Sequence, residues 1–200
     1  MSNEELKNRM DGILAGAGKK LKDVPEYAKN RTERKVTMDT INSWRRGKTQ
    51  LSAELVIVYA ELGDVLPSWI LEDYSFENGI KKVIYRDIPE RQKIYNYNVR
   101  KNVKRVLDEY RKANMVEKGK YWYGIWENGE VNLEDEFLIW MWEEVKRIEK
   151  VSIDDIVKIS EMTGKGIDEI MLGKSEILDE VERRTEELME AYKKCRNYQK

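Results

Sequence analysis

The sequence predicts a mainly α-helical protein, with a bundle of five short helices at the N-terminus and a C-terminal helical domain that includes a candidate β-hairpin. Apolar residues recur at spacings of three and four along most of the chain, and the alternation typical of strands is rare. Only 3 of the 200 residues are prolines, so few positions interrupt a helix. We expect residues 1–74 to form the first domain, 75–97 a linker and 98–200 the second domain.

The first two predicted helices each have a recognisable start or an apolar face. Residues 4–16 carry Leu6, Met10, Ile13 and Leu14 on one side, as an amphipathic helix requires. The second helix, residues 24–28, follows Asp23, a residue type favoured at N-caps. Pro25 lies in its first turn, where the missing N–H costs nothing.

The next three helices are bounded by capping residues. Thr37 is the predicted N-cap of residues 38–46, and Gly47 ends that helix because glycine tolerates a left-handed backbone. Ser52 is the predicted N-cap of the fourth helix, and Pro67 opens the fifth. The expected core positions of these last two helices are Leu55, Val58, Tyr59, Leu62, Trp69, Ile70 and Leu71.

The stretch VTMDTINSWRRGKTQLSAELVIVYAELGDVLPSWILED, residues 36–73, resembles the Cro/CI repressor (XRE) type of helix-turn-helix domain. The resemblance covers about a third of the chain. The matching landmarks are Ala28, Ile41, Trp44, Gly47, Lys48, Leu55, Ala60, Leu62, Gly63, Trp69 and Leu71. Two features depart from the family: the turn after Ala28 is about three residues longer and lacks its glycine, and Arg45 stands where the family commonly has an acidic residue.

The resemblance implies that the third helix lies in the major groove of double-stranded DNA. By position, Met38, Asp39 and Ser43 would face bases, and Thr37, Arg46 and Lys48 would face phosphates, with Asn42 and Arg45 close enough to join them. Arg31, Arg34 and Lys35 lie in the enlarged turn just ahead of this helix, and residues 29–48 carry seven positive and two negative groups. Ile41 and Trp44 would face inward. The alternative is that the helix only packs and its charges are solvated.

The second half echoes the first about one hundred residues later, where residues 151–173 resemble residues 51–73. Ser152 and Asp155 are spaced as a capping box, and residues 98–115 have the apolar period of an opening helix. Residues 118–131 alternate aromatics around Asn-Gly, which favours a β-hairpin. Residues 133–148 begin with Glu134, Asp135 and Glu136, which phosphate would repel, so this unit is expected to serve dimerisation or partner binding.

Two further segments are a predicted linker and a predicted C-terminal helix. Residues 75–97 show no clean helical period, which favours a linker. Near the C-terminus an apolar seam recurs at spacings of three and four, which predicts a helix that either pairs two chains or folds back on its own domain. The seam consists of Leu178, Val181, Thr185, Leu188, Tyr192 and Cys195.

The composition narrows the function. Histidine is absent, which removes the usual general base and the commonest transition-metal ligand, so we expect no enzyme activity, no cofactor and no metal. The single cysteine and the lack of a long apolar run predict a cytoplasmic protein without a membrane segment. We expect a homodimeric transcriptional regulator, phage or bacterial and repressor-like. The alternative is a phage-encoded protein that inhibits a host enzyme through its acidic half, since residues 127–182 carry six positive and seventeen negative groups.

Overall fold

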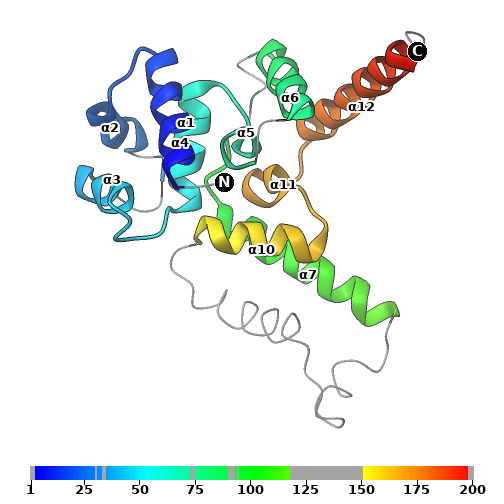
Figure 1. The fold of residues 1–200 in the computed structure, drawn as a ribbon. Coiled ribbons are helices and arrows are strands. Elements are labelled where there is room, and N and C mark those ends of the chain that lie inside the picture. Colours follow the sequence, from blue (N-terminus) through cyan, green and yellow to red (C-terminus); the bar gives the residue numbers. More distant parts are fainter. Residues whose placement is uncertain are drawn as a thin grey trace.

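The computed structural model describes residues 3–29, 31–32, 35–72, 75–89, 93, 95–117 and 151–197, and this part of the chain is mainly helical (Figure 1). Its first helices are α1 (Asn3–Gly16), the short 3₁₀ helix η1 (Leu21–Asp23), α2 (Val24–Ala28), α3 (Met38–Arg45), α4 (Ala53–Gly63) and α5 (Pro67–Leu71). They are followed by α6 (Phe76–Asp87), α7 (Val99–Glu117), α10 (Ile153–Thr163), α11 (Ile167–Leu172) and α12 (Glu176–Asn197). The predicted hairpin at 118–131 and the predicted helix at 133–148 lie outside the described residues.

The helices predicted in the first 73 residues occur at the expected places, and most of the expected caps form. The Thr37 hydroxyl accepts a hydrogen bond from the Thr40 N–H at 3.1 Å, and the Ser52 hydroxyl accepts one from Leu55 at 3.4 Å. Gly47 has a φ of 69°, the left-handed conformation expected after α3. Asp23 differs from the prediction, because its carboxylate accepts from the Lys20 N–H at 2.8 Å and therefore caps η1 rather than α2.

The segment predicted to be a linker contains a packed helix, which corrects that part of the sequence analysis. Ser75 caps α6 by accepting from the Asn78 N–H at 3.0 Å, so the Asn-Gly pair that indicated a turn lies in the first helical turn. Ile84 and Tyr85 are buried, and α6 packs against α5 and α12. Further on, the Tyr95 hydroxyl donates to the Val65 carbonyl at 3.2 Å. The described residues of this segment are therefore part of the folded body.

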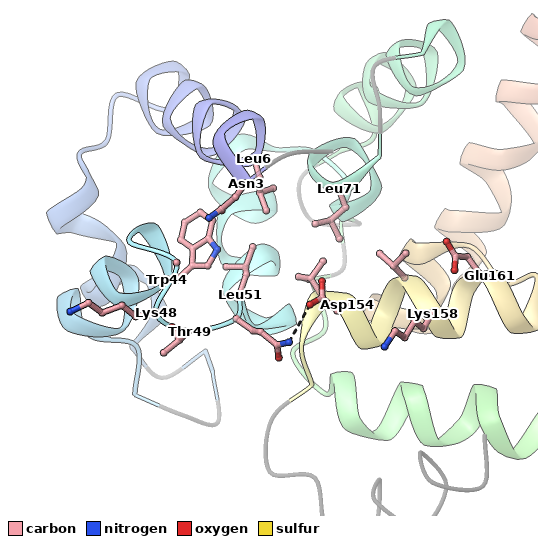
Figure 2. A pocket seen from close by; sticks show the side chains of 14 residues that line it. Asn3, Leu6, Trp44, Lys48, Thr49, Leu51, Leu71, Asp154, Lys158 and Glu161 are labelled. Atoms are coloured by element: carbon pink, nitrogen blue, oxygen red, sulfur yellow. Dashed lines mark hydrogen bonds between the residues drawn. The ribbon is translucent and has the colours of Figure 1, made fainter. Parts of the chain in front are cut away.

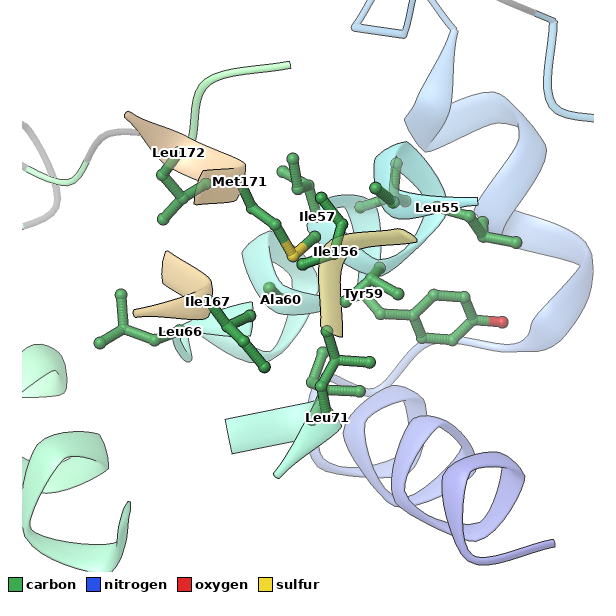
Figure 3. Packing of buried hydrophobic residues seen from close by; sticks show 14 of the residues in the cluster. Leu55, Ile57, Tyr59, Ala60, Leu66, Leu71, Ile156, Ile167, Met171 and Leu172 are labelled. Atoms are coloured by element: carbon green, nitrogen blue, oxygen red, sulfur yellow. The ribbon is translucent and has the colours of Figure 1, made fainter. Parts of the chain in front are cut away.

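A single cluster of buried apolar side chains joins the two predicted domains (Figure 3). Leu55, Ile57 and Tyr59 of α4 enter it from the first half, and Ile156 and Met171 of α10 and α11 from the second. Helices α1, α4 and α5 pack together, as do α7, α10 and α11, and α5 contacts α11. The two halves are thus held by a shared core, in which apolar burial is the main stabilising contribution.

The C-terminal helix α12 folds back onto its own chain along the first part of the predicted seam. Val181 and Thr185 are buried and α12 lies along α6, whereas Leu188 and Tyr192 are about half exposed. The Tyr192 ring still contacts Phe76, with centroids 4.6 Å apart. Of the two alternatives for this seam, packing within the chain accounts for its N-terminal part.

The glycine at the end of α4 predicts a measurable packing effect. A Cβ added at Gly63 would lie 2.8 Å from the Cγ2 atom of Ile13, whose branched side chain has little freedom to move. We expect Gly63→Ala to lower the free energy of unfolding by about 1–3 kcal/mol. Gly79→Ala in α6 is the matched control, since its Cβ meets nothing within 4 Å, and it should stabilise by about 0.5–1 kcal/mol. Urea titrations of both variants test this, and equal effects would contradict it.

Candidate nucleic-acid interface

Helix α3 is held in place by two side chains on its inner face. Ile41 is 0% exposed and Trp44 is 4% exposed, so both lie in the core, as the sequence analysis predicted. The Thr37 cap fixes the start of the helix and the Gly47 turn fixes its end. The opposite face of α3 is consequently presented in a fixed orientation at the surface.

The exposed face of α3 is narrower than the predicted contact set. Asp39 and Arg46 are exposed and Ser43 is half-buried between them, on the side of the helix that faces solvent. Met38 was predicted to face bases, but it packs against the core and is only partly accessible. Thr37 and Asn42 are half-buried. Positions 39, 43 and 46 form one edge of the helix, of which Asp39 and Arg46 are exposed, and Thr40 beside this edge is exposed as well.

Arg45, which was predicted to join the DNA contacts, pairs with a carboxylate of a neighbouring helix. Its guanidinium donates two hydrogen bonds to the Asp11 carboxylate of α1, at 2.8 and 2.7 Å. This bond to Asp11 raises the pKa of Arg45 above its usual range. Position 45 lies on the side of α3 that faces α1, so the departure from the family at this residue contributes a bidentate pair between helices.

Arg31, in the enlarged turn before α3, also interacts with other residues of the same chain. Arg31 donates to the Tyr27 carbonyl at 2.9 Å, its guanidinium lies 4.2 Å from the centre of the Tyr27 ring, and Glu61 is 3.5 Å away. Lys35 is exposed. Arg34 lies outside the described residues. Among the predicted cations whose side chains the structure describes, Lys35, Arg46 and Lys48 are the ones on the exposed surface without an ion pair to another described residue.

A groove separates the C-terminal end of α3 and the loop after it from helix α10 (Figure 2). Its volume is about 810 Å³, and its lining combines the residues after α3 with one side of α10 and the start of α1. The apolar lining residues are Leu6, Trp44, Leu51, Leu71, Ile153 and Val157. Lys48 lines it on the α3 side, and Asp154, Lys158 and Glu161 on the α10 side.

The α10 side of the groove is a feature that the sequence analysis did not find. Gln50 donates to the Asp154 carboxylate at 3.2 Å, which links the loop after α3 to α10 across 104 positions of sequence. Two carboxylates, Asp154 and Glu161, therefore lie on the α10 side of the groove, opposite Lys48. The sequence feature related to this contact is the similarity between residues 51–73 and 151–173. Similarity alone does not indicate that two segments contact each other.

Comparisons of the chain with family models, with curated proteins and with solved structures gave no match. In the described part of the chain, no helix is both long and apolar enough to cross a membrane. The same residues contain no group of three or more His, Cys, Asp or Glu placed to hold a metal ion. The assignment of a function therefore depends on the arrangement around α3.

Proposed function

We propose that the protein is a sequence-specific DNA-binding transcriptional regulator of the repressor type, phage or bacterial. The observation that carries the proposal is the anchoring of α3: Ile41 and Trp44 are buried on one face, while Arg46 and Lys48 are exposed at its end. A helix held in this way can enter the major groove while neighbouring cations contact phosphates. The resemblance of residues 36–73 to the Cro/CI repressor type supports the same function.

Within this proposal the contact residues divide into two groups. Lys35, Arg46 and Lys48 contact phosphates, and Asp39 and Ser43 face base edges. A carboxylate on this face accepts a hydrogen bond from a cytosine amine, so Asp39 favours C over the other bases at one position. Arg31 and Arg45 hold the unit together through Tyr27, Glu61 and Asp11.

We expect Arg46→Gln/Lys48→Gln to weaken binding to duplex DNA by about tenfold or more, because two charge-assisted contacts to phosphate are lost. The dependence of log Kd on log salt concentration should fall in slope by about 2, one for each lost contact. Electrophoretic mobility shifts or fluorescence anisotropy on a random duplex, measured over a series of salt concentrations, give both quantities.

Arg45→Gln is the matched control, since it removes a neighbouring charge that is already paired with Asp11. It should leave the salt slope unchanged and lower stability by no more than about 1 kcal/mol, the usual range for a partly exposed ion pair. Equal loss of binding in the control and the double variant would contradict the assignment of Arg46 and Lys48 as the phosphate contacts. Absence of DNA binding, with a host protein retained from nuclease-treated extract, would favour the inhibitor alternative instead.

A further inference from the structure

The described helices on the two sides of the shared core repeat in order, and one pair of them also shares its length and capping. Helices α4 and α10 are both 11 residues long and start one hundred positions apart, at Ala53 and Ile153. Ser52 and Ser152 cap them through the same hydroxyl contact to the N–H three residues on. Both end in a left-handed residue, Asp64 with a φ of 54° and Gly164 with a φ of 66°. The similarity of sequence between these segments is thus matched by the same local structure.

The first helix of each half repeats in the same way, with 93 positions between equivalent residues. The buried positions of α1 are Leu6, Arg9, Met10, Ile13 and Leu14, and those of α7 are Val99, Asn102, Val103, Val106 and Leu107. The buried polar residue of each helix donates a hydrogen bond to a backbone carbonyl of the same half. Arg9 donates to the Ile70 carbonyl of α5 at 3.2 Å, and Asn102 donates to the Met171 carbonyl of α11 at 2.9 Å. The described helices of each half therefore follow a common plan.

The two copies meet through equivalent residues. Around Ser52 and Ser152, the Ala53 N–H donates to the Val151 carbonyl and the Ile153 N–H donates to the Leu51 carbonyl, both at 3.1 Å. Ser68 of α5 donates its N–H and hydroxyl to the carboxylate of Asp168 in α11, at 2.8 and 2.6 Å.

Helices α6 and α12, which start one hundred positions apart, also contact each other, and Lys81 lies 3.0 Å from Glu182 there. In an interface between identical surfaces, residues near the two-fold axis contact their own counterparts. The pairs at 52 and 152 and at 68 and 168, each one hundred positions apart, therefore mark an approximate two-fold axis inside one chain. The surface that two copies of such a unit would share is already filled.

The two copies differ in the part that would contact DNA. The first has Arg46 and Lys48 at the exposed end of α3. The counterpart in the second falls within residues 118–150, outside the described residues, and its sequence opens its predicted helix with Glu134, Asp135 and Glu136. Three consecutive carboxylates are repelled by phosphate. In the described residues, the cationic edge next to α3 belongs to the first copy alone.

We infer that the chain is a covalently joined pair of related units whose pairing surface is occupied internally, and that it contacts duplex DNA as a monomer, through one edge, at a site without inverted symmetry. The DNA part of this inference rests on the proposed function; the internal pairing does not. It replaces the homodimer expected from the sequence with a partner already present in the same chain.

Disulfide trapping tests the internal pairing. In the antiparallel arrangement around Ser52 and Ser152, the Cα atoms are about 4.5 Å apart, within reach of a disulfide. In a Cys195→Ser background, oxidised Ser52→Cys/Ser152→Cys should run as a single chain on a non-reducing gel. The matched control, Ser52→Cys alone, should form no disulfide-linked dimer. A covalent dimer from the single variant, or an interchain disulfide from the pair, would overturn the inference.

Sedimentation equilibrium of the unmodified chain gives a second readout that does not depend on the variants. The expected mass is that of one chain up to tens of micromolar, and a dimer at those concentrations would overturn the internal pairing. Duplexes selected from a random pool should saturate at one chain each and contain no inverted repeat. Two chains bound to one palindromic duplex would contradict monomeric binding. If no duplex were bound, the proposed function would be wrong, and the disulfide trapping would still test the internal pairing independently.

Discussion

Truncation of Trp44 to alanine is expected to lower the free energy of unfolding by about 3–5 kcal/mol, the range found when a large buried aromatic side chain is removed. Trp44 is 4% exposed and lines the base of the groove between α3 and α10. Since domains of this size are stable by only about 5–15 kcal/mol, this loss removes a large part of the stability. Its loss should also release α3 from the core.

Denaturant titrations followed by far-ultraviolet circular dichroism measure this effect, with the m-value as a check that cooperativity is kept. Trp44→Phe is the control, because it keeps an aromatic ring in the core and should cost less than the alanine variant. Under conditions in which Trp44→Phe is folded, its affinity for duplex DNA should be close to that of the wild type. A loss below about 1 kcal/mol for Trp44→Ala would mean that the indole contributes little to holding α3.

The second large effect concerns Asp168, a buried carboxylate between the two copies. Burial raises its pKa to about 6, against the opposing effect of the two hydrogen bonds from Ser68. Glu72 raises the same pKa further and Lys81 lowers it. The folded state therefore keeps the Asp168 proton at pH values where the unfolded chain, with an ordinary value near 3.8, has released it.

The sign of the pH dependence follows from proton binding. Between about pH 4 and pH 6 the folded state binds more protons than the unfolded state at this residue, so stability falls as the pH rises. Asp168 thus opposes folding above pH 6 and not below pH 4. At about 1.4 kcal/mol for each pH unit between the two pKa values, the ionised carboxylate costs about 3 kcal/mol at neutral pH.

Asp168→Asn should remove this cost because the amide is neutral and retains both contacts. Its oxygen can accept from the Ser68 N–H and its nitrogen can donate to the Ser68 hydroxyl. We expect the variant to match the wild type near pH 4 and to exceed it by up to about 3 kcal/mol at pH 7. Urea unfolding at a series of pH values from 4 to 7.5 gives the difference curve. A constant difference over that range would contradict the assignment of the titration to Asp168.

Asp168→Ala separates the charge from the hydrogen bonds. It removes the carboxylate but leaves the Ser68 N–H without its partner in a buried position, which costs about 1–3 kcal/mol. The alanine variant should therefore lose the same pH dependence as the asparagine variant while being less stable than it at every pH. Equal stability of the two variants would show that the contacts to Ser68 contribute little.

The positions of the helices could be predicted from the sequence because they depend on residues within four positions of one another. The Thr37 cap, the Gly47 turn and the inward side of α3 all follow from local spacing. The predicted linker was wrong at α6 because Asn78-Gly79 is typical of turns, whereas the packing of Ile84 and Tyr85 against neighbouring helices adds to the Ser75 cap in stabilising a helix over these residues.

The candidate site was predicted less completely than the fold. The resemblance to the Cro/CI type placed Ile41 and Trp44 inward, and both are buried. It could not distinguish Arg45, which pairs with Asp11 across 34 positions, from Arg46, which is exposed. Adjacent residues on a helix point in different directions, and the packing of α1 decides which of the two is enclosed.

The sequence by itself determined the helical composition, the caps, the lack of histidine chemistry and the similarity of two segments one hundred residues apart. Only the packing of the folded chain shows that Ser52 meets Ser152, that Ser68 meets Asp168, and that Arg45 is paired while Arg46 is exposed. Local structure depends on hydrogen bonds and side-chain spacing within a turn or two of helix. Contacts between distant segments depend instead on how helix faces pack around a common core, which spacing along the chain does not encode.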